Sequence, residues 1–117
     1  MKRELTNTET GILTIRSYSK DLTKKPGVYK MLDNNKNILY IGKAKNLFNR
    51  VKSYTNLNNH TYRIKKMISE TRSMEFTITG TEAEALLLEA NLIKKNKPKY
   101  NIAMRDDKSF AKILVNK

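Results

Sequence analysis

The chain has 117 residues, of which 24 are lysine or arginine and 11 are aspartate or glutamate, giving a formal net charge of +13. This length accommodates one domain with a modest core and excludes two. The charge favours a polyanionic partner such as nucleic acid, although AT-rich coding would also enrich lysine. The absence of cysteine excludes disulfides and thiolate chemistry. The sequence lacks a signal peptide and an apolar run of transmembrane length, so we expect a soluble, cytoplasmic protein.

The N-terminal segment carries one predicted helix. Residues 1–10 are polar, and we expect them to be frayed. Residues 11–22 show apolar residues at helical spacing, which predicts a short amphipathic helix. Its apolar stripe consists of Ile12, Ile15, Tyr18 and Leu22. Pro26 and Gly27 then end the helical segment, because both residues interrupt regular structure.

A β-hairpin is predicted next, with strands at 28–32 and 38–41. If the asparagine pair between them forms a two-residue turn, Tyr29 lies directly opposite Tyr40, whereas a longer loop or a bulge would shift this register. Side chains alternate along strands, so both tyrosine hydroxyls project from one face. The other face is expected to carry Val28, Leu39 and Ile41.

A helix is expected from about Ala44 to Tyr54, after Gly42 ends the second strand. One stripe of this helix consists of Lys43, Leu47, Arg50 and Tyr54, so that a lysine, an arginine and a tyrosine point together from the end of the hairpin. The adjoining core stripe consists of Ala44, Phe48 and Val51. His60 closes the polar loop that follows, and we expect it to be solvent exposed.

The second half of the chain alternates helices and strands. We expect a helix over 61–71, a strand over 74–79 and a helix over 81–95 that a capping box begins. A charged turn at 105–108 and a final short strand at 110–115 complete the chain.

Glu89 is the unusual residue of the last predicted helix, because its helical neighbours are apolar. These neighbours are Ala85, Leu86, Leu92 and Ile93. A carboxylate in such a stripe is costly to desolvate unless a cation meets it. The cation is either a lysine or arginine in a structural ion pair or a divalent metal, and position alone favours the ion pair.

Tyrosines, cations and one carboxylate together suit hydrolysis of a phosphodiester. Cations near phenols lower the pKa of the phenol and bind phosphate oxygens. A carboxylate holds a hard divalent metal that keeps most of its waters. From the residues alone, a non-catalytic module that binds nucleic acid remains the competing hypothesis.

Two short sequences resemble the signature of the GIY-YIG nucleases, Gly27-Val28-Tyr29 and Tyr40-Ile41-Gly42. Further blocks in the same order look like the N-terminal domain of UvrC, the excinuclease of bacterial nucleotide excision repair. These blocks are Pro26–Tyr29, Tyr40–Leu47, Thr81–Glu89, Pro98–Asn101 and Arg105–Ser109. The resemblance as a whole covers about residues 12–115, and the ordered set of blocks is far more specific than the short signature.

The resemblance implies an α/β (α+β) GIY-YIG fold, with a small three-stranded antiparallel sheet flanked by helices. It implies an N-terminal extension with a short helix at 1–24 and the endonuclease domain at 25–104. Residues 105–117 are then the charged turn and short strand that begin a linker to further domains. The chain is accordingly either a fragment of a longer protein or a stand-alone nuclease of another pathway.

The implied activity is a metal-dependent DNA endonuclease that makes the 3′-side incision in excision repair. Tyr40 is the implied general base that activates water, with Lys43 assisting its deprotonation. Tyr29 orients the nucleophile or its water. Arg50 holds the scissile phosphate, helped by Tyr54.

The remaining roles are also implied by the resemblance. Glu89 is the sole protein ligand of one Mg²⁺ or Mn²⁺ ion, Asn101 completes the pocket by a hydrogen bond, and Gly27 and Gly42 are structural parts of the motif. Exposed cations contact the DNA backbone without reading sequence, which predicts salt-dependent binding, and the candidates are Lys45, Lys52, Arg63 and Lys66. The implied partners are damaged duplex DNA and UvrB with the UvrA–UvrB system.

Overall fold

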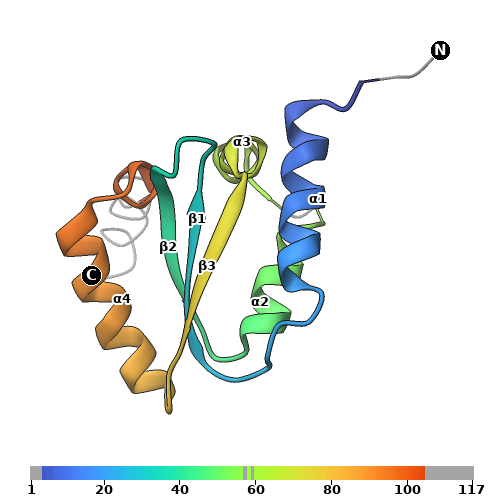
Figure 1. Ribbon diagram of the computed structural model, residues 1–117. Coiled ribbons are helices and arrows are strands. Elements are labelled where there is room, and N and C mark those ends of the chain that lie inside the picture. The colour runs from blue at the N-terminus through green and yellow to red at the C-terminus, as the bar shows by residue number, and fades with distance from the viewer. Residues whose placement is uncertain (1–3, 57, 59, 105–117) are drawn as a thin grey trace, which may run out of the picture.

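The computed structural model describes residues 4–56, 58 and 60–104. Its elements are α1 (Asn7–Ser19), β1 (Gly27–Leu32), β2 (Ile38–Ala44), α2 (Leu47–Ser53), α3 (Tyr62–Glu70), β3 (Ser73–Ile78) and α4 (Glu82–Asn96). Residues 99–104 are also helical. The strands form one antiparallel sheet in the order β2-β1-β3, with α4 on one side and α1 and α2 on the other (Figure 1). This confirms the predicted fold class; the turn predicted at 105–108 and the strand at 110–115 lie outside the described residues.

Helix α1 begins four residues before the predicted start, because Thr6 and Glu9 form a capping box. The Glu9 amide donates to the Thr6 hydroxyl at 3.0 Å, and the Thr6 amide donates to the Glu9 carboxylate at 2.9 Å. The expectation that 1–10 is frayed is therefore wrong for 7–10. The helix also ends at Ser19 rather than at Leu22.

Helix α1 packs against α3 and contributes to the main core. Ile15 is fully buried. A side chain at Gly11 would collide with the backbone carbonyl of Ile68 in α3, so glycine permits the close approach of the two helices. Tyr18, predicted to face inward, is 41% exposed and lies beside Phe76 with 6.5 Å between ring centroids.

The hairpin register differs from the predicted one by two residues. Tyr29 pairs with Gly42, and Met31 pairs with Tyr40, before a bulge shifts the pairing at Leu32. The predicted direct pairing of Tyr29 with Tyr40 is therefore wrong.

The cause of the shift is a turn longer than two residues. The Asp33 carboxylate accepts hydrogen bonds from the amides of Asn35 and Asn37, both at 2.9 Å. Lys36 adopts a left-handed conformation with φ of 67°. An aspartate that binds the amides two residues ahead stabilises a wider turn than an asparagine pair alone requires.

The shift of two preserves which face each side chain occupies, since strand side chains have a period of two. Tyr29 and Tyr40 share one side, as predicted, with ring centroids 6.2 Å apart. Leu39 packs in the same cluster as Tyr29, whereas Val28 and Ile41 pack on the other side. The prediction for Leu39 is wrong because the β-bulge changes its face.

Strand β2 continues to Ala44, so α2 starts later than predicted. Asn46 caps α2 by accepting a hydrogen bond from the Asn49 amide at 3.0 Å. Lys43 is consequently a strand residue rather than a helix residue, and Leu47 is fully buried. Of the predicted stripe, only Arg50 and Tyr54 lie against each other, with the Arg50 guanidinium over the Tyr54 ring.

The elements after α2 follow the prediction closely. Thr61 caps α3 by accepting from the Ile64 amide, and Thr81 caps α4 by accepting from the Glu84 amide at 3.1 Å. Helix α4 ends before Lys97, which has a positive φ of 46°. In the part of the chain that the structure describes, no helix is long and apolar enough to cross a membrane.

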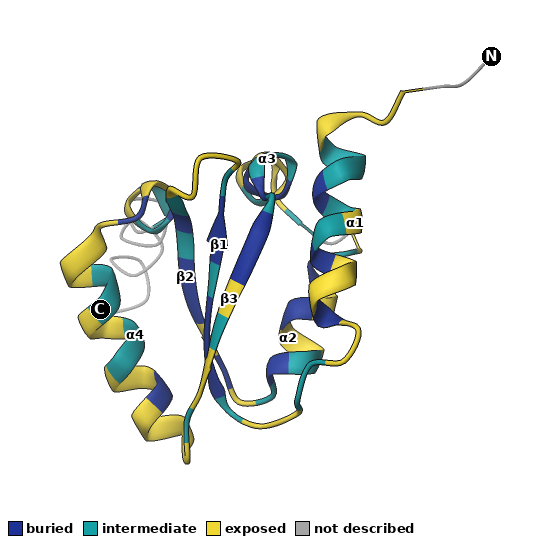
Figure 2. Ribbon diagram, viewed as in Figure 1, coloured by how far each residue is buried: buried dark blue, intermediate teal, exposed yellow. Residues whose placement is uncertain are grey.

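The core has two unequal parts, on the two sides of the sheet. The larger part lies among the sheet, α1, α2 and α3, and includes Tyr29 and Tyr54. The smaller part lies under α4, where Ala85 meets Val28 and Ile41. Most of α4 is exposed or half-buried (Figure 2), including Leu86 at 53%. The apolar stripe around Glu89 is thus only partly a core stripe.

Candidate active site

A buried pair of tyrosine hydroxyls lies at the centre of the site. Tyr29 extends from the central strand, Tyr54 follows α2, and their hydroxyl oxygens are 2.7 Å apart. The rings meet edge to face, with 5.9 Å between centroids, and each residue is 1% exposed. This contact fixes the end of α2 against the sheet.

Arg50 completes this cluster from the preceding turn of α2. Its Nε donates to the Tyr29 hydroxyl at 3.3 Å, and its guanidinium carbon lies 5.0 Å from the centroid of the Tyr54 ring. The residue is otherwise exposed. Its terminal guanidinium nitrogens therefore remain positioned to meet an anion such as a phosphate.

Tyr40 lies at the edge of the same cluster, half-buried on strand β2. Burial raises the pKa of the Tyr40 hydroxyl, the charges of Tyr54 and Glu89 raise it further, and Arg50 acts in the opposite direction. Arg50 thus lowers the pKa of this phenol, as expected of a nearby cation, but burial outweighs it, so the net pKa of Tyr40 in the protein alone is raised.

Burial controls the other two phenols in the same way. It raises the pKa of Tyr29 to about 12, with the charge of Tyr40 adding to the rise and Arg50 opposing it. Burial also raises the pKa of Tyr54 well above its ordinary value. Tyr29 and Tyr54 accordingly remain protonated hydroxyls across the physiological range.

Glu89 reaches the cluster from the opposite side of the sheet. It is half-buried on α4, and its charge contributes to the raised pKa of Tyr40. The two side chains therefore come within electrostatic reach across edge strand β2. Among the described residues, no group of three or more histidine, cysteine, aspartate or glutamate side chains forms a metal cluster. One carboxylate beside a phosphate site suits Mg²⁺, which keeps several waters and uses few protein ligands.

Asn101 holds the backbone of β2 rather than projecting into open space. Its Oδ1 accepts from the Ile41 amide at 2.7 Å, and its Nδ2 donates to the Ile41 carbonyl at 2.9 Å. Ile41 stands between Tyr40 and Gly42. The carboxamide therefore fixes the strand segment from which Tyr40 extends.

Lys43 lies apart from the tyrosine cluster. Alternation along β2 directs its side chain to the opposite face from Tyr40. There it borders an open hollow of about 290 Å³ together with Ala44, Lys45, Glu82, Ala83, Ala85 and Leu86. The structure thus gathers Tyr29, Arg50 and Tyr54, adds Tyr40 and Glu89 at the edge, and leaves Lys43 with the start of α4.

His60 joins the site, although no pattern in the sequence indicates this. Its ring stacks on Tyr54 with centroids 5.6 Å apart and 20° between planes. Its Nε2 lies 2.8 Å from the Ser53 carbonyl oxygen. The expectation of a solvent-exposed loop histidine is wrong, since the residue is half-buried. No periodicity in the sequence links it to Tyr54.

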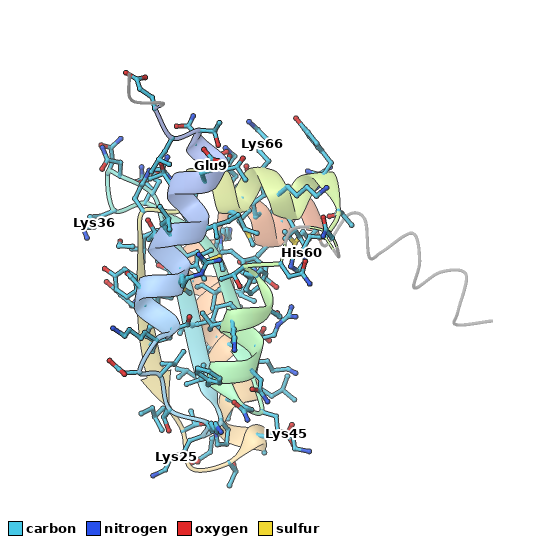
Figure 3. The ribbon with its side chains drawn as sticks, turned by 90° about the vertical axis from the view of Figure 1, so that its right-hand side faces the viewer. Glu9, Lys25, Lys36, Lys45, His60 and Lys66 are labelled. Atoms are coloured by element: carbon cyan, nitrogen blue, oxygen red, sulfur yellow. The ribbon has the colours of Figure 1, made fainter. Side chains whose placement is uncertain are left out.

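The predicted DNA-contacting cations are spread over the surface. Lys45 and Lys66 lie toward opposite ends of the molecule (Figure 3), and Lys66 also lies 3.9 Å from the Glu70 carboxylate. Arg63 is exposed on α3. Lys52 lies over the Phe48 ring, with its ammonium 5.3 Å from the centroid. These positions give a broad basic surface rather than one compact patch.

Comparison with known proteins identifies the domain. Residues 25–102 match the family model described as a UvrC-like GIY-YIG domain. The chain belongs to the UvrC-like GIY-YIG family. It is 55% identical over 107 residues to UvrABC system protein C of Maricaulis maris, and 54% identical over 105 residues to that of Bartonella quintana.

These alignments cover 92% and 90% of this chain but only 17% and 16% of the two relatives. The chain therefore spans about one sixth of the length of these two relatives.

Solved structures give the same family. The GIY-YIG N-terminal endonuclease domain of UvrC from Thermotoga maritima, bound to its catalytic divalent cation magnesium, is 42% identical, with a TM-score of 0.66. The match covers 74% of this chain and 93% of that one. A point mutant of the same Thermotoga maritima domain, bound to its catalytic divalent cation, matches at 42% identity with a TM-score of 0.66, covering 74% and 92%.

The glycines of the GIY-YIG signature have steric roles. A side chain at Gly42 would overlap the ring and hydroxyl of Tyr29. A side chain at Gly27 would collide with the carbonyl of Thr77 and with Leu47. Gly42 therefore makes room for Tyr29, and Gly27 permits close packing of β1 against β3 and α2.

Proposed function

We propose that this chain is a metal-dependent DNA endonuclease domain that hydrolyses a phosphodiester bond. We further propose that it makes the 3′-side incision in bacterial nucleotide excision repair. The observation that carries the proposal is the Tyr29–Tyr54–Arg50 cluster beside Tyr40 and Glu89 at the edge of the sheet. The names of the relatives support the pathway, and the magnesium-bound relative supports the metal.

Tyr40 acts as the general base in this proposal and takes a proton from the attacking water. Its raised pKa makes the phenolate a strong base that is scarce at neutral pH. Glu89 and water molecules would hold one Mg²⁺ or Mn²⁺ ion, whose charge favours the phenolate and stabilises charge on the phosphate and the leaving oxygen. Without a metal ion, the charge of Glu89 raises the pKa of Tyr40. With a metal ion bound to Glu89, the positive charge of the ion would lower the pKa of Tyr40 again.

Arg50 binds the scissile phosphate through its terminal nitrogens. Tyr29 orients Arg50 by accepting its Nε–H, and Tyr54 fixes Tyr29 through the hydroxyl contact. Asn101 positions Tyr40 by holding Ile41. Assistance by Lys43 stays a prediction, because its side chain leaves β2 on the face opposite Tyr40.

The partners in this proposal are damaged duplex DNA and UvrB with the UvrA–UvrB system, in the cytoplasm. Lys45, Lys52, Arg63 and Lys66 contact the DNA backbone. Residues 25–104 carry the nuclease, and residues 105–117 lead toward further domains, as in a longer UvrC-type chain.

The test is cleavage of supercoiled plasmid with Mg²⁺ or Mn²⁺ by the wild type and by Tyr40→Phe and Glu89→Gln. Both variants should lose about 100-fold or more of the nicking rate, because each removes a group that acts on the reacting atoms. Tyr62→Phe and Glu82→Gln are matched controls at exposed positions and should cleave normally.

Undiminished nicking by both folded variants would refute the site. Mn²⁺ binding, followed by electron paramagnetic resonance, supplies a readout that does not depend on cleavage. Glu89→Gln should weaken it, whereas Glu82→Gln should not.

A further inference from the structure

A groove between α1 and α2 lies outside the tyrosine cluster and includes Lys52, one of the proposed DNA contacts. Its volume is about 530 Å³, and it is lined by Leu13, Arg16, Ser17, Ser19, Lys20, Phe48, Lys52 and Thr55. None of these residues belongs to the tyrosine cluster. Helix α1 precedes residues 25–102, which match the family model, so one wall of the groove comes from outside the matched region.

The groove is strongly cationic. Arg16 enters from α1, Lys20 from the cap at its C-terminal end and Lys52 from α2. No carboxylate is among the described residues that line the groove. Asp21, although next to Lys20 in sequence, does not line the groove. Arg16, Lys20 and Lys52 are all exposed, so their charges face solvent rather than a packed interior.

Phe48 arranges part of this charge. The ammonium groups of Lys24 and Lys52 lie 5.8 and 5.3 Å from the centroid of its ring. A cation over an aromatic face is attracted by the ring quadrupole, which restrains two otherwise flexible side chains. Phe48 therefore holds two lysines close to the groove.

The floor and wall of the groove combine apolar and hydroxyl groups. Leu13 is 46% exposed, and Phe48 is half-buried beside it. Ser17 and Thr55 add hydroxyls along the lining. Both hydroxyls donate to backbone carbonyls within the protein, those of Thr14 and Lys52, so the cations are the groups that face a ligand. Apolar surface bordered by cations complements a sugar–phosphate chain, which presents apolar deoxyribose faces between anionic phosphates.

We propose that the α1–α2 groove binds the backbone of one DNA strand next to the bond that is cleaved. Lys52 and Arg50 lie two positions apart on the seven-residue helix α2 and face different sides of it. The groove and the tyrosine cluster therefore flank the same helix, one on each side. This inference rests on the proposed nuclease function in one respect: that function identifies the bound polyanion as DNA. The groove then fixes the register of the substrate while Arg50 contacts the reacting phosphate.

The test is DNA binding by the full 117-residue chain without metal, measured by fluorescence anisotropy with a short labelled duplex and a matching single strand. The variant is Arg16→Gln/Lys20→Gln, which removes two exposed charges from the groove. The matched control is Lys94→Gln/Lys95→Gln, which removes two charges from the last turn of α4, on the other side of the sheet.

The groove variant should bind DNA more weakly, and the slope of log K against log salt should fall by about 1 to 2 between about 50 and 200 mM salt. The control should keep the wild-type slope. Equal losses in both variants would show a general charge effect and overturn the proposal, as would no loss in either. Equally tight binding of polyglutamate that also depends on Arg16 and Lys20 would indicate an acidic protein partner and overturn it too.

Phe48→Leu tests the contribution of the ring while keeping an apolar floor. It should weaken DNA binding less than the double variant does, and wild-type affinity would contradict the role assigned to the ring.

In the nicking assay, Arg16→Gln/Lys20→Gln should raise KM and leave kcat unchanged. A lower kcat at unchanged KM would overturn the docking role. Because DNA binding is measured without metal, a negative result for the groove can be told apart from a lack of nuclease activity.

Discussion

Tyr29 lies across the hairpin from Gly42, and its ring and hydroxyl occupy the space that any side chain at position 42 would need. The tyrosine of one half of the signature thus packs on the glycine of the other half. This arrangement directs the Tyr29 hydroxyl to Tyr54, 2.7 Å away. The two short motifs are one packing unit, and the tyrosine cluster depends on both.

Gly42→Ala should displace Tyr29, break its contact with Tyr54 and lower the free energy of unfolding by about 1–3 kcal/mol, because a buried aromatic ring has little room to move. Nicking should fall in parallel. Gly80→Ala is the matched control, since its added methyl would meet only the flexible end of Glu84, at 2.7 Å. Thermal unfolding and plasmid nicking measure the two effects, and wild-type behaviour of Gly42→Ala in both would contradict the packing role.

The stability of the fold should fall between about pH 10 and pH 12. The pKa of Tyr29 is raised from 10.0 to about 12, mainly by burial. Above pH 10 the unfolded chain releases this proton while the folded chain keeps it, so the free energy of unfolding decreases as pH rises. The contribution of Tyr29 is fully present below pH 10 and amounts to about 3 kcal/mol.

Urea unfolding across this pH window measures the effect. Tyr29→Phe should show a shallower decline than the wild type, because phenylalanine has no proton to release. Parallel profiles for the two proteins would rule out a buried, protonated Tyr29.

Arg50→Lys should reduce nicking by about 10- to 100-fold with little change in thermal stability. Lysine keeps the charge but lacks the Nε that donates to Tyr29 and the planar fork that binds phosphate in two places. Arg63→Lys, on exposed α3, makes the same change outside the cluster and should retain activity. Equal rates for Arg50→Lys and wild type would show that charge alone suffices.

Asn101→Ala should loosen β2 at Ile41. Loss of the side chain removes two hydrogen bonds to one backbone unit, at a cost of about 1–3 kcal/mol. Hydrogen exchange at the Ile41 amide should accelerate, and nicking should decline because Tyr40 is less firmly held. Asn96→Ala, whose side chain bonds only within its own helix, is the control. Unchanged exchange at Ile41 would contradict the positioning role.

Local sequence signals predicted most of the elements but not their exact relations. Strand alternation placed Tyr29 and Tyr40 on one side even though the register was wrong by two, because an even shift leaves the faces unchanged. The bulge that moved Leu39 depends on Asp33 and its amide contacts, which the asparagine pair obscured. The residues of the capping box, Thr6 and Glu9, are present in the sequence, but the polar composition of residues 1–10 favoured the prediction of a frayed end.

Contacts between segments that are far apart in the chain could not be predicted from the sequence. Asn101 hydrogen-bonds Ile41, 60 positions away in the sequence, and the His60 ring stacks on Tyr54. Neither has a periodic signal, because each depends on how elements pack in three dimensions. The direction of the Tyr40 pKa shift was also unpredictable, since it follows from the degree of burial rather than from neighbouring charges alone.

Strand β2 is an edge strand of the sheet. The backbone amides and carbonyls on the outer side of an edge strand can pair with a strand of another protein. At Ile41 the Asn101 carboxamide imitates such a strand by satisfying both the amide and the carbonyl. A side chain thereby ends the growth of the sheet next to Tyr40. Among the described residues no fourth strand pairs with this edge, and the Asn101 contact occupies the position at Ile41 that such a strand would need.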